Sequence, residues 1–177
     1  FLNVSAQTYS DSTIDMAAKR VQWADIQQFA IGSYGEAHYN QILDANTRNN
    51  GKADLHRIIT YLGYRFNKNL QFFSEIEFEH VSEVYVEQAF VNYHFNDKLN
   101  FKVGQLLIPM GYVNEFHEPT LFNGVERPIV DKYMVPSTWR ELGFGFHGLL
   151  KKASLKYQLY AVNGFNGYDD GATISGS

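Results

Sequence analysis

Apolar and polar residues alternate in about seven short segments of this sequence, and this alternation limits the possible folds more than any other feature. In the clearest segment, Leu99–Leu107, the apolar Phe101 and Val103 share a parity that Lys102 does not. Because successive side chains of a β-strand point to opposite faces, each segment is expected to form a strand with one apolar and one polar face. This pattern is typical of a transmembrane β-barrel, which is apolar towards lipid and polar towards its lumen.

The links between these segments are of two kinds. Tight polar turns are expected at 67–69, 96–98 and 151–154, after every second strand, with longer links between them. The longest link separates Pro109 from Leu142 by about thirty residues, and links of that length in compact domains usually have a function. Short turns on one rim and longer loops on the other are typical of bacterial outer-membrane barrels. We therefore predict an all-β fold: an antiparallel transmembrane β-barrel with about seven strands in this chain.

Composition excludes several other classes. The formal net charge is −4 and the only basic clusters are Lys19-Arg20 and Lys151-Lys152, so nucleic acid is not an expected partner. The absence of cysteine excludes disulfide frameworks, thiol catalysis and cysteine-based zinc sites. No apolar run approaches the ~20 residues that a spanning helix needs, whereas 14 Phe and 12 Tyr favour strands.

The first 28 residues are expected to lie outside the barrel. Residues 1–6, followed by Gln7, read either as the remnant of a secretory signal peptide cleaved after Ala6 or as an ordinary apolar N-terminus. The segment 11–28 has apolar residues at mixed helical spacing and is interpreted as a short periplasmic helix or an extension. The barrel is expected to occupy residues 29–177.

Several separated motifs carry a family resemblance. They are Gly32–Asn40, Phe72–His80, Gly104–Gly111, Asn114–Pro119, Phe122–Pro128 and Val135–Gly143. In this order they resemble the phosphate-selective porin O and P family, over about residues 29–165.

The resemblance implies a sixteen-stranded, usually trimeric porin of the bacterial outer membrane. Such a barrel contacts membrane lipid or lipopolysaccharide and lets small hydrophilic solutes or ions diffuse through, with residues 110–139 folded into the lumen as a constriction. Because this chain ends after about seven strands, it is expected to hold about the N-terminal half of the barrel. The lumen-facing positions do not form a row of basic residues of the kind expected for phosphate selectivity. Three basic residues there, Arg57, Arg65 and Lys102, are balanced by three acidic ones, Glu75, Glu77 and Glu79.

The residues expected to line the passage or its constriction are ionisable residues at lumen parity or on the long loop. They are Arg57, Glu75, Glu77, Lys102, Glu115, His117, Glu118, Arg127, Lys132 and Arg140. No catalytic residue, cofactor or bound metal is expected, and ion selectivity would come from rings of charge and from the width left by the loop.

Four alternatives remain beside the channel. Gly143-x-Gly145-x-x-Gly148 matches a dinucleotide fingerprint, but it lies within an alternating strand and opens no helix. Loop residues such as His117 and Glu118 would form only an irregular metal site. An outer-membrane barrel enzyme of the phospholipase type would need a Ser, His and Asn constellation on the outer wall. A soluble β-sandwich binding module would show the same alternation but would bury its apolar faces in a core.

Overall fold

The structure is a computed structural model. It describes residues 28–41, 43, 50–117, 122, 127–130 and 138–164. The expected signal remnant and nearly all of the expected N-terminal helix, residues 1–27, lie outside the described residues, as do Glu118 and Lys132. Within the described part of the chain, no helix is long and apolar enough to span a membrane.

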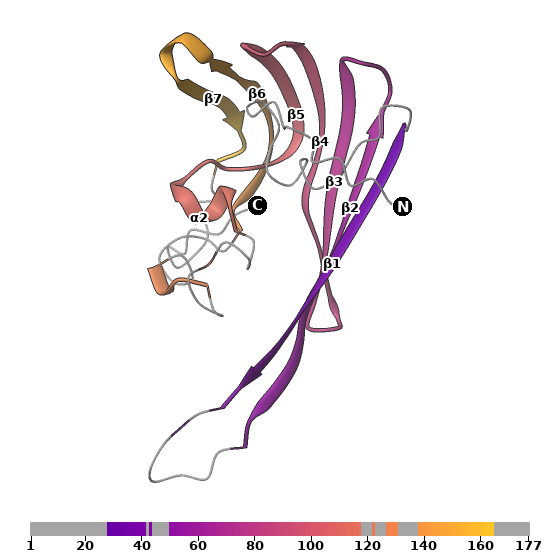
Figure 1. Cartoon of the computed structure of the whole chain (residues 1–177), viewed down its shortest axis with the longest axis vertical. Helices are drawn as coiled ribbons and strands as arrows, with labels where there is room; N and C mark the ends of the chain where they lie inside the picture. Colours follow the sequence, from indigo (N-terminus) through magenta and orange to yellow (C-terminus); the bar gives the residue numbers. More distant parts are fainter. Residues whose placement is uncertain are drawn as a thin grey trace, which may run out of the picture.

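Seven strands pair in sequence order to form one antiparallel sheet, shown side by side in Figure 1. They are β1 (Phe29–Asn40), β2 (Lys52–Arg65), β3 (Leu70–Glu79), β4 (Glu83–Asn96), β5 (Leu99–Leu107), β6 (Arg140–Leu150) and β7 (Leu155–Val162). The predicted all-β, antiparallel class is confirmed. The sheet curves but does not close, because β1 and β7 each pair with one neighbour among the described residues. The long β5–β6 connection contains the short helix α2 (Gly111–Glu115), and the β6–β7 connection contains the 3-10 helix η2 (Lys151–Ala153).

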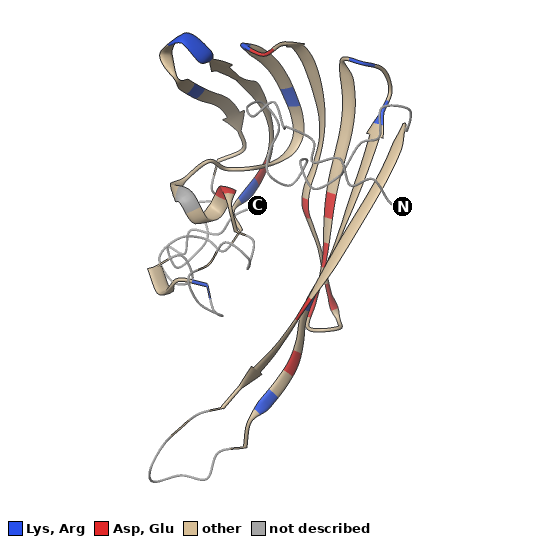
Figure 2. Ribbon diagram, viewed as in Figure 1, with Lys and Arg blue, Asp and Glu red and all other residues tan. Residues whose placement is uncertain are grey.

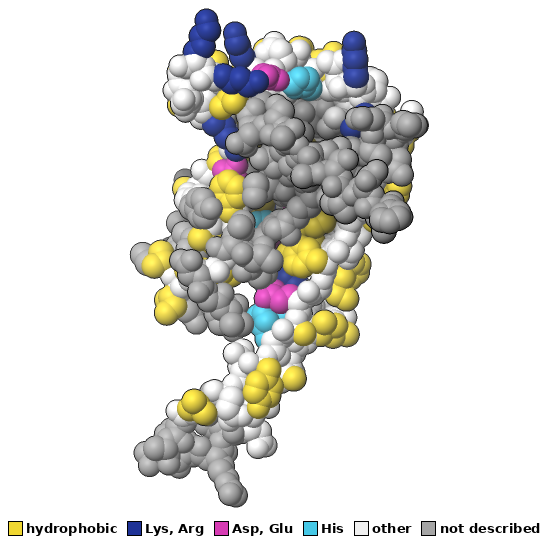
Figure 3. All heavy atoms as spheres, in the orientation of Figure 1, with side chains coloured by type: hydrophobic (Ala, Val, Ile, Leu, Met, Phe, Trp, Pro, Cys, Tyr) yellow, Lys and Arg dark blue, Asp and Glu magenta, His cyan; other side chains and the backbone are white. Residues whose placement is uncertain are grey.

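One face of this sheet is apolar and exposed. Antiparallel partners share a face, so the register places Tyr93, Phe101, Phe146 and Leu159 in one row across β4 to β7. Large apolar side chains recur on this face from β1 to β7: Ile31, Ile58, Tyr64, Phe78, Val84, Val86, Val103, Leu142 and Phe144 are all exposed. Ile31 is 66% exposed and Leu159 is 71% exposed. Hydrophobic side chains follow the outer side of the sheet at the right of Figure 3. We call this surface the apolar face.

The opposite face, which we call the polar face, carries buried charges beside a row of aromatic rings. Glu75 is fully buried and Glu77 is 3% exposed. Tyr61, Phe73 and Phe90 follow one another across β2, β3 and β4, with ring centroids 6.0 and 5.4 Å apart. The sidedness is therefore the reverse of that in a soluble protein, where charged residues are exposed and large apolar residues are buried.

Two β-bulges change which residues reach the polar face. In β2 the register passes from Glu36–Arg57 to Ala37–Leu55, which leaves His56 as an extra residue. In β4 it passes from Glu75–Gln88 to Ile76–Val86, which leaves Glu87 extra. A bulge places two residues opposite one and re-aims a side chain. Simple alternation assigns His56 and Glu87 to the apolar face, but their contacts lie on the polar face.

The turns at one end of the strands match the prediction, and one connection at the other end is also short. Turns join β2 to β3, β4 to β5 and β6 to β7 as expected. Asn67 Oδ1 accepts hydrogen bonds from the backbone N–H groups of Asn69 and Leu70, both at 2.9 Å. The β3–β4 connection is also a short turn, where the sequence Val81-Ser82-Glu83 indicates one, so not every link at that end is a longer loop. The chain reverses tightly there because His80 and Val81 adopt left-handed backbone angles, with φ of 46° and 69°. Left-handed angles cost roughly 1–2 kcal/mol for a residue with a Cβ.

Gly104 in β5 provides a test of this register. Its φ is +137°, and an added Cβ would lie 2.2 Å from the Ala89 carbonyl oxygen. Gly104→Ala is therefore expected to destabilise the fold by at least about 1–3 kcal/mol, measured as a lower midpoint of urea unfolding. Gly35→Ala in β1 is the matched control, because its nearest atoms lie at 3.6 and 3.7 Å. Equal midpoints for the two variants would contradict the pairing of β4 with β5.

Candidate functional site

The polar face is organised around Arg57, whose guanidinium connects three strands. Its Nε lies 3.0 Å from Glu36 Oε2 on β1, and its Nη1 lies 2.7 Å from Glu77 Oε1 on β3. Nη2 lies 3.6 Å from Glu79 Oε1. The planar guanidinium suits several carboxylates at once. One predicted site residue, Arg57, thus neutralises part of the charge of another, Glu77.

A second polar cluster lies further along the same face, on β3, β4 and the long loop. Gln88 Nε2 donates to Glu75 Oε2 at 2.7 Å. The bulged Glu87 lies 2.7 Å from His117 Nε2 through its Oε2 atom and 3.5 Å from Arg140 Nη1, at the start of β6, through its Oε1 atom. Acidic segments lie on neighbouring strands in the middle of the sheet in Figure 2. The sheet therefore contacts the loop residue His117 through Glu87, a residue that strand alternation alone does not place on the polar face.

The two ends of the β5–β6 loop are held together by one side chain. Asn114 Nδ2 donates to the carbonyl oxygens of Ile108, at 2.7 Å, and Trp139, at 2.9 Å. The Trp139 backbone N–H in turn donates to Asn114 Oδ1 at 2.7 Å. Asn114 is buried, so its amide uses most of its hydrogen-bonding capacity in closing the base of the loop.

The loop also contacts the last strand of the sheet. Glu115 Oε1 accepts from Gln158 Nε2 at 2.7 Å and lies 3.3 Å from Lys156 Nζ, both on β7. With His117 on Glu87, the short segment 114–117 therefore contacts both β4 and β7. The described part of the loop crosses the polar face between these strands.

Three further predicted residues, Lys102, Arg127 and Arg140, each contact a neighbouring side chain. Lys102 Nζ lies 4.3 Å from the centre of the Phe90 ring, a cation–π arrangement. Arg127 Nη2 donates to Thr138 Oγ1 at 3.3 Å, within the loop. Arg140 also lies over the Tyr85 ring, 5.3 Å from its centre. Glu118 and Lys132 lie outside the described residues.

Sequence reasoning missed Glu36, Glu87 and Asn114 as site residues. Glu36 has the parity of the polar face, so the alternation of polar and apolar residues in β1 is a signal that could have identified it as a site residue. Glu87 was missed because a bulge changes its side, which a single sequence does not reveal. No pattern in the sequence distinguishes Asn114, since its partners at Ile108 and Trp139 are backbone groups at both ends of a long loop.

The buried His117 imidazole lies beside two carboxylates, those of Glu87 and Glu75, that favour its protonated form. It is 3% exposed, and burial by itself lowers the pKa of an imidazole. The adjacent Glu87 carboxylate and the nearby Glu75 carboxylate outweigh that effect and raise the pKa of His117 above its usual value. A protonated His117 therefore favours the docked position of the loop.

Comparisons with known proteins assign no activity to this arrangement. No family model matches the chain, and no solved structure matches it. The chain is similar to an uncharacterized protein of Aquifex aeolicus (strain VF5), with 42% identity over 143 residues, 76% of this chain and 32% of that protein. The chain thus spans about a third of the length of this relative. Function is therefore inferred from the geometry.

The His117–Glu87 contact predicts a pH-dependent stability. The pKa of His117 in the folded protein lies above its value of about 6.5 in the unfolded chain. The stabilisation that protonation of His117 gives to the fold is therefore fully present below about pH 6.5. This stabilisation is lost as the pH rises through the raised pKa. The difference in urea midpoint between the native protein and His117→Gln is expected to be largest just below about pH 6.5 and to shrink as the pH rises above that value.

The control for this experiment is His94→Gln. His94 contacts Asn100 near the short-turn end of the sheet, away from the loop, so this variant reports the general effect of losing an imidazole. A His117→Gln difference that stays constant over the whole pH range would show that the imidazole charge does not hold the loop.

Proposed function

We propose that this protein is a porin-like channel of the bacterial outer membrane, through which small hydrophilic solutes or ions diffuse passively. The observation that carries the proposal is the reversed sidedness of the sheet. Large apolar side chains on every strand are exposed, while Glu75, Glu77 and Lys102 are buried on the other face. A lipid-facing outer wall around a polar lumen requires this arrangement.

The apolar face argues against a protein that functions in water. Apolar surface exposed to water costs about 25 cal/mol of free energy per Å² relative to buried surface. A contiguous exposed apolar patch larger than a few hundred Å² therefore indicates a surface that contacts another protein or a membrane. The exposed apolar residues here extend from Ile31 on β1 to Leu159 on β7. In a soluble β-sandwich this face would pack against a second sheet, so lipid is the environment that we propose for it.

The polar face argues for a lumen. Charged groups in lipid are costly unless they pair or reach water. Here carboxylates pair with Arg57 and Arg140, and the loop that crosses the face contributes His117 and Glu115. We propose that the loop narrows the passage and that its charges, with those of the wall, set ion preference.

The open edges of the sheet require partners in such a membrane. β1 and β7 each have one neighbour among the described strands, and unpaired backbone groups in lipid cost several kcal/mol each. We propose that further strands close the barrel. The motifs described above resemble those of the phosphate-selective porins, so we propose a sixteen-stranded barrel assembled as a trimer.

Reconstitution in a planar bilayer tests the channel. The protein with its full natural sequence, folded in detergent, is expected to give stepwise, ohmic conductance, because a polar lumen conducts ions. The same preparation unfolded in urea and diluted into the bilayer chamber is the control. A folded protein that inserts without conductance would refute the channel.

Chemical labelling tests the orientation that we propose. Bacterial barrels keep short turns in the periplasm and longer loops outside, so a cysteine at Asn50, beside the long β1–β2 loop, is expected to react with an impermeant thiol reagent on intact cells. A cysteine at Lys68, in a short turn, is the matched variant and is expected to react only after the outer membrane is opened. These 177 residues contain no cysteine. Labelling of Lys68→Cys but not Asn50→Cys on intact cells would reverse the assignment.

A further inference from the structure

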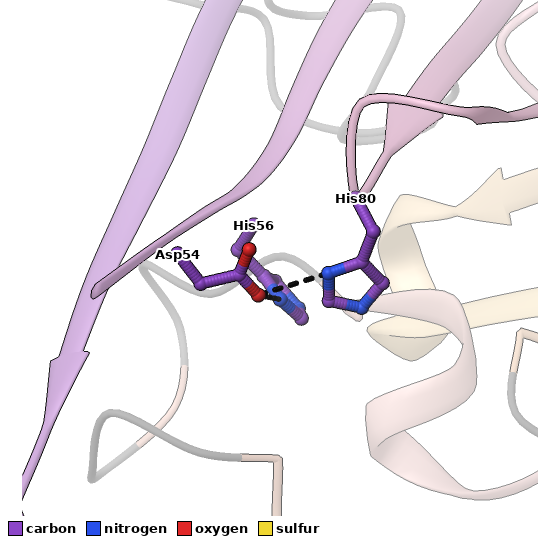
Figure 4. Close-up of side chains that lie close together, drawn as sticks. All are labelled: Asp54, His56 and His80. Atoms are coloured by element: carbon purple, nitrogen blue, oxygen red, sulfur yellow. Dashed lines mark ion pairs between the residues drawn. The ribbon is translucent and has the colours of Figure 1, made fainter. Parts of the chain in front are cut away.

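A cluster of histidines lies on the polar face where the β3–β4 turn meets the projecting β1–β2 hairpin (Figure 1). Asp54 and His56 come from β2, and His80 comes from the turn. Figure 4 shows the three side chains pointing towards one another. His80 Nδ1 lies 2.9 Å from Asp54 Oδ2, and His56 Nδ1 lies 3.9 Å from the same oxygen.

The spacing of the donor atoms fits one metal ion. One ligand atom from each of the three residues lies within 4.8 Å of the other two. Donors bound tetrahedrally to Zn²⁺ at about 2.0–2.1 Å are about 3.4 Å apart, so small side-chain rotations suffice. Two imidazole nitrogens and one carboxylate oxygen are a donor set that borderline divalent ions such as Zn²⁺ or Fe²⁺ accept, with room for water at the open positions.

Two departures from regular strand geometry bring these histidines together. The β2 bulge turns His56 to this side of the sheet, and the left-handed backbone at His80 and Val81 lets the turn present His80 to it. Strained or bulged backbone is enriched at functional sites. An ordinary strand and an ordinary turn would place neither imidazole beside Asp54.

Neighbouring groups support the two imidazoles. His38 stacks on His56, with ring centroids 4.6 Å apart and planes 15° apart, and the His56 ring meets His80 edge-on at 4.9 Å. Glu79 Oε1 lies 3.5 Å from His56 Nε2. With a metal on Nδ1, the His56 Nε2–H faces this carboxylate, the usual partner of a metal-bound histidine.

The local charge favours a cation, although Arg57 lies nearby. Arg57 Nη2 is 2.7 Å from His56 Nε2, and a metal on Nδ1 requires this contact to loosen. Arg57 keeps two carboxylate partners when this contact loosens, since its Nε lies 3.0 Å from Glu36 Oε2 and its Nη1 lies 2.7 Å from Glu77 Oε1. With Asp54 and Glu79, the region has four carboxylates against this one guanidinium. His80 is 44% exposed at its side chain, so an ion reaches the cluster from solvent.

We propose that Asp54, His56 and His80 form a binding site for a divalent transition-metal ion, with Zn²⁺ as the probe. The inference does not depend on channel activity. A second group of potential ligands, Glu75, Glu87 and His117, is already accounted for by the Glu87–His117 contact that docks the loop.

Calorimetric titration of Zn²⁺ into the detergent-folded protein, purified without a histidine tag and stripped with a chelator, tests the site. One ion is expected to bind per chain, and Mg²⁺ is expected to bind far more weakly, because it prefers oxygen ligands. His80→Asn and His56→Gln are each expected to weaken Zn²⁺ binding by at least about tenfold. Asn at position 80 tolerates the left-handed backbone, so this variant keeps the turn.

His94→Asn is the matched control, since it removes a histidine near the other end of the sheet, where it contacts Asn100. Unchanged binding in this variant supports the site. Cobalt absorption gives a second readout, because Co²⁺ in a tetrahedral protein site absorbs visible light more strongly than the octahedral aqueous ion, and the signal is expected to disappear in His80→Asn. Absence of Zn²⁺ binding, or equal loss of binding in His94→Asn and His80→Asn, overturns the proposal.

Discussion

The antiparallel hydrogen-bond ladder decides which side chains share a face, and every other feature of this structure depends on it. Each strand pairs with the next in sequence order, so one register after another keeps large apolar side chains on one face and charged ones on the other. A slip of β3 by one residue against its neighbours would place Glu75 and Glu77 among the exposed apolar residues. The bulges at His56 and Glu87 are local exceptions, and both add an ionisable side chain to the polar face.

Charge compensation then links the wall to the loop. A buried carboxylate needs a hydrogen-bonded or charged partner. Arg57 on β2 is the charged partner of Glu77 on β3, so this pair lies within the sheet. Glu87 is served by Arg140 at the start of β6 and by His117 from the loop. Docking of the loop is therefore part of the electrostatic balance of the sheet, and a change of charge at Glu87 would alter both the wall and the loop.

The polar face has different chemistry along its length. Near the loop, buried groups are matched pair by pair, which favours a fixed geometry. At the projecting end of β1 and β2, three histidines and several carboxylates crowd around one guanidinium, and His80 is partly open to solvent. The backbone there adopts angles that are unfavourable for Val81. Matched pairs stabilise the fold, whereas a crowded, accessible cluster on strained backbone is the kind of place where a ligand adds stability.

The sequence by itself determined the strands, the three Asn- or Lys-led turns and the sides of most residues, because alternation with period two is a local property of the chain. It correctly placed Arg57, Glu75, Glu77 and Lys102 opposite the apolar residues. It did not determine the sides of His56 and Glu87 or the partners of Asn114. A bulge depends on how two strands pair, and a loop closure depends on backbone groups about thirty residues apart, so only the tertiary structure decided them.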